Sequence, residues 1–158
     1  NGCQTVLDIG FGTGTLTQKL YEHGCTVYGQ DFSQRMIELA KVKMPKAELY
    51  QGDFTKGLVE TLKQNRYDAI VATYSLHHLT DAEKVVFIEN LRPLLNDGGK
   101  IYIGDVMFGN RVQMEACRAD AGDEWDGDEI YFVVDELQAR FPQMRFEPLS
   151  YCSGVLTL

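Results

Sequence analysis

The chain has 158 residues, enough for one domain, and its 44% hydrophobic and 24% charged residues are ordinary for a globular protein. No apolar run approaches the roughly 18 residues that a membrane-spanning helix needs, and the first residues lack a signal-peptide pattern, so we expect no membrane contact. Of the net charge of −8, residues 111–136 carry −7, from nine acids and two bases. Such a segment repels phosphate backbones and argues against a nucleic-acid partner, although a solvated acidic face is its simplest interpretation.

The cysteines form no CxxC pair and have no metal-ligand spacing. They are Cys3, Cys25, Cys117 and Cys152. We therefore expect no metal site and a reducing, cytoplasmic location.

Apolar runs alternate with segments of helical period over the first two thirds of the chain. Runs with the composition of strands cover residues 5–10, 25–31, 47–53, 67–75 and 98–108. Helical segments cover residues 15–24, 33–44 and 81–95, the second capped by Ser33 and the third bent or ended near Pro93. In the first helix, Leu16, Leu20 and Tyr21 share one face. This alternation predicts a parallel sheet with right-handed crossovers.

Beyond residue 108 the pattern loosens. We expect a helix over residues 110–121, an irregular acidic link, and a helix over residues 134–141, before Pro142. Residues 145–158 are expected to form two short strands joined around Ser153 and Gly154. There is no repeat and no second core, so the prediction is a single domain, residues 1–158.

A glycine-rich turn, "VLDIGFGTG", follows the first predicted strand and precedes a helix. In a doubly wound sheet ligands bind outside the carboxyl ends of the strands, and glycines there let a ligand approach the backbone. Asp31 ends the second strand 21 residues after Gly10. That matches the spacing of about 20 at which an acid accepts hydrogen bonds from a ribose. Turn, strand and acid together predict a nucleoside site.

The turn does not fit a dinucleotide cofactor. A dinucleotide fingerprint needs glycine or alanine three places after its second glycine, where this chain has Thr15 or Thr17. Asp8 would also set a carboxylate near a pyrophosphate, whereas it suits a ligand with positive charge. A nicotinamide-dependent reductase is therefore the disfavoured alternative.

Five ordered segments together resemble the class I S-adenosylmethionine-dependent methyltransferases. They are "VLDIGFGTG", "VYGQDFSQRMIELAK", "QGDF", "YDAIVATYSLHHL" and "LLNDGGKIYIGD", and the likeness runs from residue 4 to about 108. It is closest to small stand-alone bacterial enzymes that act on small molecules. The resemblance implies an α/β fold, doubly wound and Rossmann-like, with a mostly parallel seven-stranded sheet and helices on both faces. The last strand, which "SGVLTL" would supply, is expected to lie antiparallel between the fifth and sixth.

The resemblance also implies S-adenosylmethionine as cofactor and S-adenosylhomocysteine as product. Gly10, Phe11 and Gly12 would form the backbone wall against the methionine end. Asp8 would support the ammonium group, directly or through water, and Asp31 would bind the ribose.

The adenine would lie among residues of the next turns. Phe32 and Met36 would pack near it, Asp53 would accept its amino group, and the amide of Phe54 would face a ring nitrogen. Thr73 would contact the methionine portion. The alternatives are that Asp8, Asp31 and Asp53 cap helices and that Met36 fills the core.

Methyl transfer from a sulfonium needs alignment and exclusion of water more than acid and base. If the acceptor arrives protonated, His77 is the predicted base, in preference to His78, because histidine titrates near neutrality. A packed or solvated histidine is the alternative. Tyr74 and Tyr131 are weaker candidates for orienting an acceptor, and Trp125 could bind an amine or anchor a loop.

The predicted function is methyl transfer to a small molecule, and the alternative is a catalytically silent cofactor-binding module that acts as a sensor or partner. Relatives usually carry helices ahead of the first strand that help to cover the site, so we expect a poorly covered pocket here. The acceptor and the oligomeric state are left open by the sequence.

Overall fold

The computed structural model describes residues 4–158, and Cys3 lies outside them. Its strands are β1 (Thr5–Ile9), β2 (Thr26–Asp31), β3 (Glu48–Gln51), β4 (Tyr67–Thr73), β5 (Leu95–Phe108), β6 (Phe132–Val133), β7 (Arg145–Pro148) and β8 (Ser153–Thr157). Its α-helices are α1 (Thr15–Glu22), α2 (Gln34–Lys43), α3 (Glu60–Lys63), α4 (Asp81–Leu91), α5 (Arg111–Ala121) and α6 (Val134–Gln138). Short 3-10 helices are η1 (Phe54–Lys56), η2 (Leu76–His78), η3 (Arg92–Leu94) and η4 (Gly122–Glu124).

The main sheet has the strand order β3-β2-β1-β4-β5-β8-β7, and the short β6 pairs with β5 off this path. β8 runs antiparallel to β5 and to β7, whereas the remaining pairs are parallel. The predicted doubly wound sheet with its antiparallel last strand is therefore confirmed. The order reverses between β1 and β4, and this is the point at which such sheets open a crevice for ligands.

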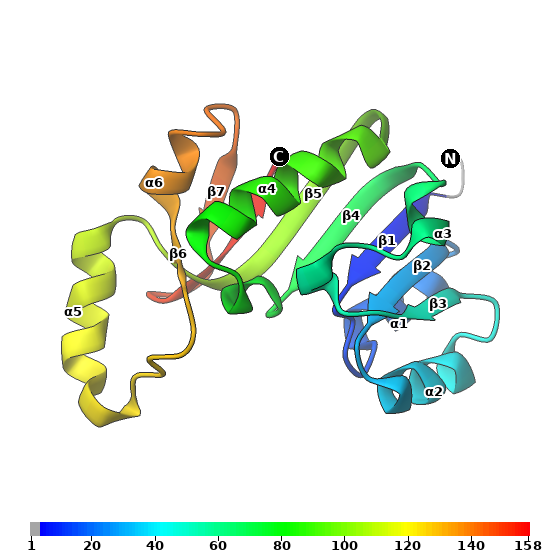
Figure 1. The fold of residues 1–158 in the computed structure, drawn as a ribbon, viewed down its shortest axis with the longest axis horizontal. Helices are drawn as coiled ribbons and strands as arrows, with labels where there is room; N and C mark the ends of the chain where they lie inside the picture. Colours follow the sequence, from blue (N-terminus) through cyan, green and yellow to red (C-terminus); the bar gives the residue numbers. More distant parts are fainter. Residues whose placement is uncertain (1–3) are drawn as a thin grey trace.

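Helices cover both faces of the sheet because neighbouring strand residues point to opposite sides. Val27 of β2 packs with Ile37 and Ala40 of α2 in one apolar cluster. Tyr28, the next residue, packs against a larger cluster on the other face, which includes Ile88 of α4. Figure 1 shows α4 lying across the sheet near β4 and β5, and α5 standing apart from the sheet at the left.

Local signals set several helix ends. Ser33 caps α2 by accepting the amide of Met36, as predicted. Thr80 and Glu83 form a capping box at the start of α4, which ends two residues before Pro93. None of the helices among residues 4–158 is both long and apolar enough to cross a membrane.

The predicted apolar face of the first helix is only partly buried: Leu20 and Tyr21 pack against the cluster of Val27, Ile37 and Ala40, whereas Leu16 is 39% exposed. The buried residue of α1 is Thr17. Two local predictions were wrong. β7 and β8 are joined by residues 149–152, so Ser153 and Gly154 lie inside β8. β5 begins at Leu95, before the predicted residue 98, because Leu95 pairs with Tyr67 ahead of an irregularity in the ladder. The short α3 and β6 were not predicted, since neither is long enough to show a period.

Candidate functional site

The glycine turn after β1 combines close packing on one side with open backbone on the other. Gly10 and Gly12 have φ values of 70° and 55°, which only glycine adopts easily. A Cβ at Gly10 would lie 2.8 Å from the Cβ of Ser75, whereas a Cβ at Gly12 would meet nothing within 4 Å. Gly10 therefore lets the loop after β4 approach the turn, and Gly12 presents bare backbone to a ligand.

Asp31 ends β2 beside this turn. Its carboxylate accepts the amide of Gly12 at 2.8 Å and the amide of Ser33 at 2.9 Å, one on each oxygen. The side chain is only 4% exposed. Because each carboxylate oxygen has a second lone pair, Asp31 keeps the capacity to accept two hydroxyl groups. The structure brings the predicted acid and the glycine turn into direct contact.

Asp8 lies in β1, almost fully buried below the turn. The hydroxyl of Thr17 donates to its Oδ2 at 2.6 Å, and its Oδ1 has no hydrogen-bond partner among the described residues. Burial raises the pKa of Asp8 to about 6, and the negative charge of Asp31 adds to the increase. A buried carboxylate oxygen without a donor is costly, which makes this position suited to a cationic group.

The residues predicted to contact the adenine differ in exposure and in their partners. Asp53 caps η1, since its Oδ1 accepts both the amide and the hydroxyl of Thr55, and these bonds hold its pKa below the usual value. Phe54 is buried and packs edge-to-face on Phe87. Phe32 is 71% exposed, and Met36 packs partly against the α2 cluster. Asp53 thus fulfils the capping alternative, its Oδ2 lies 3.8 Å from Nζ of Lys56, and Phe32 is open to solvent in the turn that follows β2.

Thr73 ends β4, and the loop after it is tightly held. Tyr74 has a φ of 51°, and its amide donates to the carbonyl of Gly104 at 2.8 Å. Ser75 donates to the carbonyl of Ile9. The loop is thus tied both to β1 and to β5.

His77 follows in η2 and is 8% exposed. Its Nδ1 lies 2.8 Å from Oδ1 of Asp105, within β5, and its Nε2 lies 3.3 Å from Oε1 of Glu129. His78, the alternative, is exposed and contacts the His77 ring at a centroid distance of 4.4 Å. The structure favours His77 over His78 as the confined titratable group.

Residues 125–131, which we call the strap, connect η4 to β6. Trp125 packs edge-to-face on Tyr131, with ring centroids 5.0 Å apart, and both lie near Phe108. Trp125 therefore anchors the strap, which is the simpler of its two predicted roles. Burial, together with Glu129, raises the pKa of Tyr131 to about 12, so its hydroxyl stays protonated at neutral pH.

A buried lysine fixes the end of the strap. The Nζ of Lys84 in α4 donates to the carbonyl of Ile130 at 2.5 Å and lies 3.2 Å from Asp81. The amide of Ile130 donates to the carbonyl of His77 at 2.8 Å. Burial lowers the pKa of Lys84 from its usual value, with Asp81 opposing the shift. The strap is thus held against both α4 and η2.

Sequence reasoning missed Thr17, Ser75, Asp105 and Glu129. Asp105 had a usable signal, because it ends the segment "IYIGD" and directly follows Gly104, the last residue of β5 that pairs with the parallel strand β4. Glu129 had none, since it is one of many acids in its segment.

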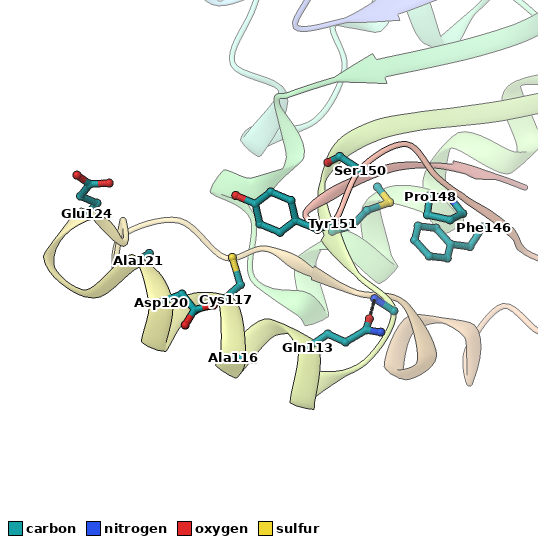
Figure 2. A pocket seen from close by; sticks show the side chains of 12 residues that line it. Gln113, Ala116, Cys117, Asp120, Ala121, Glu124, Phe146, Pro148, Ser150 and Tyr151 are labelled. Carbon is teal, nitrogen blue, oxygen red and sulfur yellow. Dashed lines mark hydrogen bonds between the residues drawn. The ribbon is translucent and has the colours of Figure 1, made fainter.

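A groove of about 800 Å³ lies between α5 and the turn that joins β7 to β8. Figure 2 shows Cys117 and Asp120 of α5 on one side and Tyr151 on the other. Phe146 and Pro148 of β7 line it with Met107 of β5. None of the sequence-predicted site residues is among those that line it.

The residues at the switch between β1 and β4 fit a cationic nucleoside. Within the part of the chain that the structure describes, Asp8 offers a buried oxygen without a hydrogen-bond partner, Gly12 offers open backbone, and each oxygen of Asp31 can accept a further hydrogen bond. A group with a sulfonium, an ammonium and a ribose meets these three features, as S-adenosylmethionine does.

The chain was compared with known proteins. The methyltransferase domain family matches residues 6–99. A protein named "uncharacterized methyltransferase" from Anoxybacillus flavithermus is 47% identical over 116 residues, which are 73% of this chain and 53% of that protein. A methyltransferase of Bacillus mycoides is 47% identical over 107 residues, 67% of this chain and 49% of its own length. The chain thus spans about half the length of the curated relatives it matches.

Solved structures share the fold at low identity. The DhpI–SAM–HEP complex superposes with a TM-score of 0.76 at 20% identity, over 97% of this chain and 77% of that one. Magnesium protoporphyrin IX methyltransferase from Synechocystis PCC 6803, with bound SAH, gives 0.72 at 18% identity, over 98% and 73%.

The family match spans more than half of the chain and includes the glycine turn, the three acids at strand ends and the loop of His77. The chain belongs to the methyltransferase domain family.

Proposed function

We propose that this chain transfers a methyl group from S-adenosylmethionine to a small-molecule acceptor. The observation that carries the proposal is the buried carboxylate of Asp8, whose Oδ1 has no hydrogen-bond partner among residues 4–158, together with the open backbone of Gly12 in the turn after β1. The bound S-adenosylmethionine and S-adenosylhomocysteine of the structural neighbours support the same cofactor class.

The binding roles follow from the geometry. Asp8 would hold the ammonium group, Asp31 the ribose hydroxyls, and the turn of Gly10, Phe11 and Gly12 the methionine backbone. The adenine would lie by Phe32, Met36, Asp53 and Phe54, with Thr73 on the methionine side. When bound, the cofactor supplies an electrophilic methyl group.

The chain's own residues would then align the acceptor and take up its proton. His77 is the proposed proton acceptor because it is confined near the carboxyl end of β4, at the switch point. The groove beside α5 is within the size range of pockets that take small molecules, which supports an acceptor of that class. We propose a cytoplasmic location and no nucleic-acid partner, on the strength of the acidic 111–136 segment.

A second candidate is a module that binds the cofactor without transferring its methyl group. It is favoured by one observation: both ring nitrogens of His77 face carboxylates, so neither faces open space. On this alternative the chain would act as a sensor or partner.

The test has a binding arm and a transfer arm. Calorimetry is expected to show binding of S-adenosylmethionine and S-adenosylhomocysteine but not of a nicotinamide dinucleotide. Methyl-labelled cofactor incubated with a metabolite extract is expected to label a small molecule. Binding without transfer would establish the silent module, and binding of the dinucleotide alone would overturn both candidates.

A further inference from the structure

The ring of His77 lies between two carboxylates that come from different parts of the chain. Asp105, within β5, approaches Nδ1 at 2.8 Å, and Glu129, on the strap, approaches Nε2 at 3.3 Å. The Asp105 side chain is 1% exposed and that of Glu129 is 27% exposed. The two carboxylates are therefore unequal in both distance and confinement.

The number of protons on the imidazole decides which of the two carboxylates can accept a hydrogen bond from it. A neutral imidazole carries one N–H donor and one lone pair, whereas a carboxylate only accepts. The shorter contact is therefore assigned as Nδ1–H donating to Asp105. Nε2 is left with its lone pair, or with a second proton, on the side of Glu129.

Asp105 is held in place by further bonds. Its Oδ1 accepts the amide of Val106 at 2.8 Å, and its Oδ2 accepts the amide of Leu76 at 3.2 Å. The bond from Leu76 joins β5 to η2, which carries His77, and the bond from Val106 lies within β5. Asp105 therefore cannot turn away without breaking contacts in both elements.

Glu129 is bound more loosely. Its side chain is partly exposed, its contact to Nε2 is the longer one, and its other neighbour is the hydroxyl of Tyr131. The nearest fixed point of the strap is the backbone of the next residue, Ile130, which is bound to His77 and Lys84. A rotation of this one side chain would release Nε2 and leave the backbone unchanged.

We infer that Asp105 is a positioning residue that fixes the tautomer and ring orientation of His77, and that Glu129 occupies the place that an N–H or O–H group of the methyl acceptor takes. The acceptor's proton passes from its nitrogen or oxygen to Nε2, and the acceptor keeps the lone pair. The resulting imidazolium lies against the buried carboxylate of Asp105. This inference rests on the proposed function for its acceptor but not for its tautomer.

A purely structural role for both acids is the alternative. Asp105 would then only satisfy the amides of Leu76 and Val106, and Glu129 would only fasten the strap. Two measurements separate these roles.

The first measurement needs no acceptor. In the full chain with labelled histidine, the long-range proton–nitrogen spectrum is expected to show neutral His77 with its proton on Nδ1. His77→Gln identifies the signal, and Glu147→Gln, which changes an exposed acid on β7, should leave it unchanged. A neutral ring protonated on Nε2 would overturn the inference, and this readout stands even if Asp105→Asn fails to fold.

The second measurement uses the acceptor found by labelling. Asp105→Asn is expected to lower kcat about 10- to 100-fold while the calorimetric Kd for S-adenosylmethionine stays within about twofold, as for a lost acid–base contribution. The double variant with His77→Gln should lose no more than His77→Gln alone, because the two act as a unit. An unchanged kcat, or fully additive losses, would mean that Asp105 is only structural.

Glu129→Ala should increase the rate at which diethylpyrocarbonate modifies His77, because it uncovers Nε2, with Glu147→Ala as the matched control. If Glu129→Ala lost as much kcat as Asp105→Asn, the inference that the acceptor takes the place of Glu129 would be overturned. If transfer is never observed but the Nδ1–H tautomer is, the proposed function fails and the role of Asp105 stands. If transfer occurs and Asp105→Asn is fully active, only the inference fails.

Discussion

Ionised Asp8 is expected to destabilise the fold without ligand and to favour binding of a cationic ligand. Its burial raises its pKa from 3.8 to about 6. A carboxyl group whose folded pKa lies above its unfolded value stabilises the fold below the unfolded pKa, and this contribution is lost as the pH rises through the folded pKa. For such a shift the loss between pH 4 and pH 7 is about 2.4 kcal/mol.

Asp8→Asn should remove this loss, because an amide does not ionise. Urea unfolding without cofactor is expected to show the variant gaining on the natural chain by about 2–3 kcal/mol between pH 4 and pH 7. The same variant should gain less thermal stability from added S-adenosylmethionine. Asp68→Asn is the control: hydrogen bonds from Thr5 and Asn96 lower the pKa of Asp68, so its difference should have the opposite sign. If the difference in unfolding free energy between Asp8→Asn and the natural chain did not vary with pH, the raised pKa of Asp8 would be contradicted.

Asp31→Ala is expected to weaken binding of S-adenosylmethionine. Charge-assisted hydrogen bonds to two hydroxyls contribute about 1.5–3 kcal/mol, which is tenfold to more than a hundredfold in Kd. Calorimetry measures the change, and Asp53→Ala, which removes the exposed cap of η1, should have a smaller effect. An unchanged Kd for Asp31→Ala would remove this residue from the site.

The sequence could predict the residues whose evidence is local. Asp31 and Gly12 belong to a turn and a strand end that can be recognised from spacing, and the structure joins them by a hydrogen bond. The contacts of His77 could not be predicted, because Asp105 and Glu129 reach it from β5 and from the strap. Only the sheet order brings these segments together.

At the scale of the elements, alanine substitutions in two glycine turns can distinguish a loss of fold stability caused by backbone strain from a loss of cofactor affinity caused by a blocked site. Gly12 and Gly24 both have positive φ, 55° and 87°, and a Cβ at either position would meet no atom within 4 Å. Alanine at each should therefore destabilise the fold by a similar amount, about 1–2 kcal/mol. Only one of the two lies at the candidate site.

Gly12→Ala is expected to raise the Kd for S-adenosylmethionine at least tenfold, whereas Gly24→Ala should leave it unchanged. Thermal unfolding checks that the two variants are destabilised alike, and calorimetry compares their affinities. Equal affinities would show that no ligand approaches the Gly12 backbone.

The first helix shows where periodicity reaches its limit. Periodicity predicts that Leu16 shares an apolar face with Leu20 and Tyr21, but Leu16 is 39% exposed and the fully buried residue of the helix is Thr17. The reason is the buried carboxylate of Asp8, which needs a hydroxyl donor at that position. A polar partner in the core follows from a neighbour in space, not from the helix's own sequence.

Across the whole molecule, Lys84 links α4, the strap and the loop of His77. Lys84→Met keeps the length and apolar contact of the side chain but removes its bond to the carbonyl of Ile130. Hydrogen exchange at the amide of Ile130, which donates to His77, is expected to accelerate about tenfold or more. Lys100→Met, at an exposed position of β5, is the control, and equal exchange in both variants would mean that the aromatic contacts of Trp125 alone hold the strap.

The sheet as a whole was predictable because its signals are periodic. Alternating strands and helices up to Phe108 gave the parallel order, and the resemblance gave the antiparallel strand between β5 and its neighbour. The region after Phe108 was predicted in outline only. Its strands are short and its strap is irregular, so long-range contacts rather than period decide its course.

The placement of β8 has a consequence for how the sheet is assembled. β7 reaches the sheet only through β8, and the two are joined by a turn of residues 149–152. A hairpin of this kind closes within microseconds, before strands distant in the chain can meet. We therefore expect β7 and β8 to dock onto β5 as one preformed unit. Until that event the edge of β5 from Tyr102 to Val106 has unpaired backbone groups, and the half-built sheet can recruit a second chain there and aggregate.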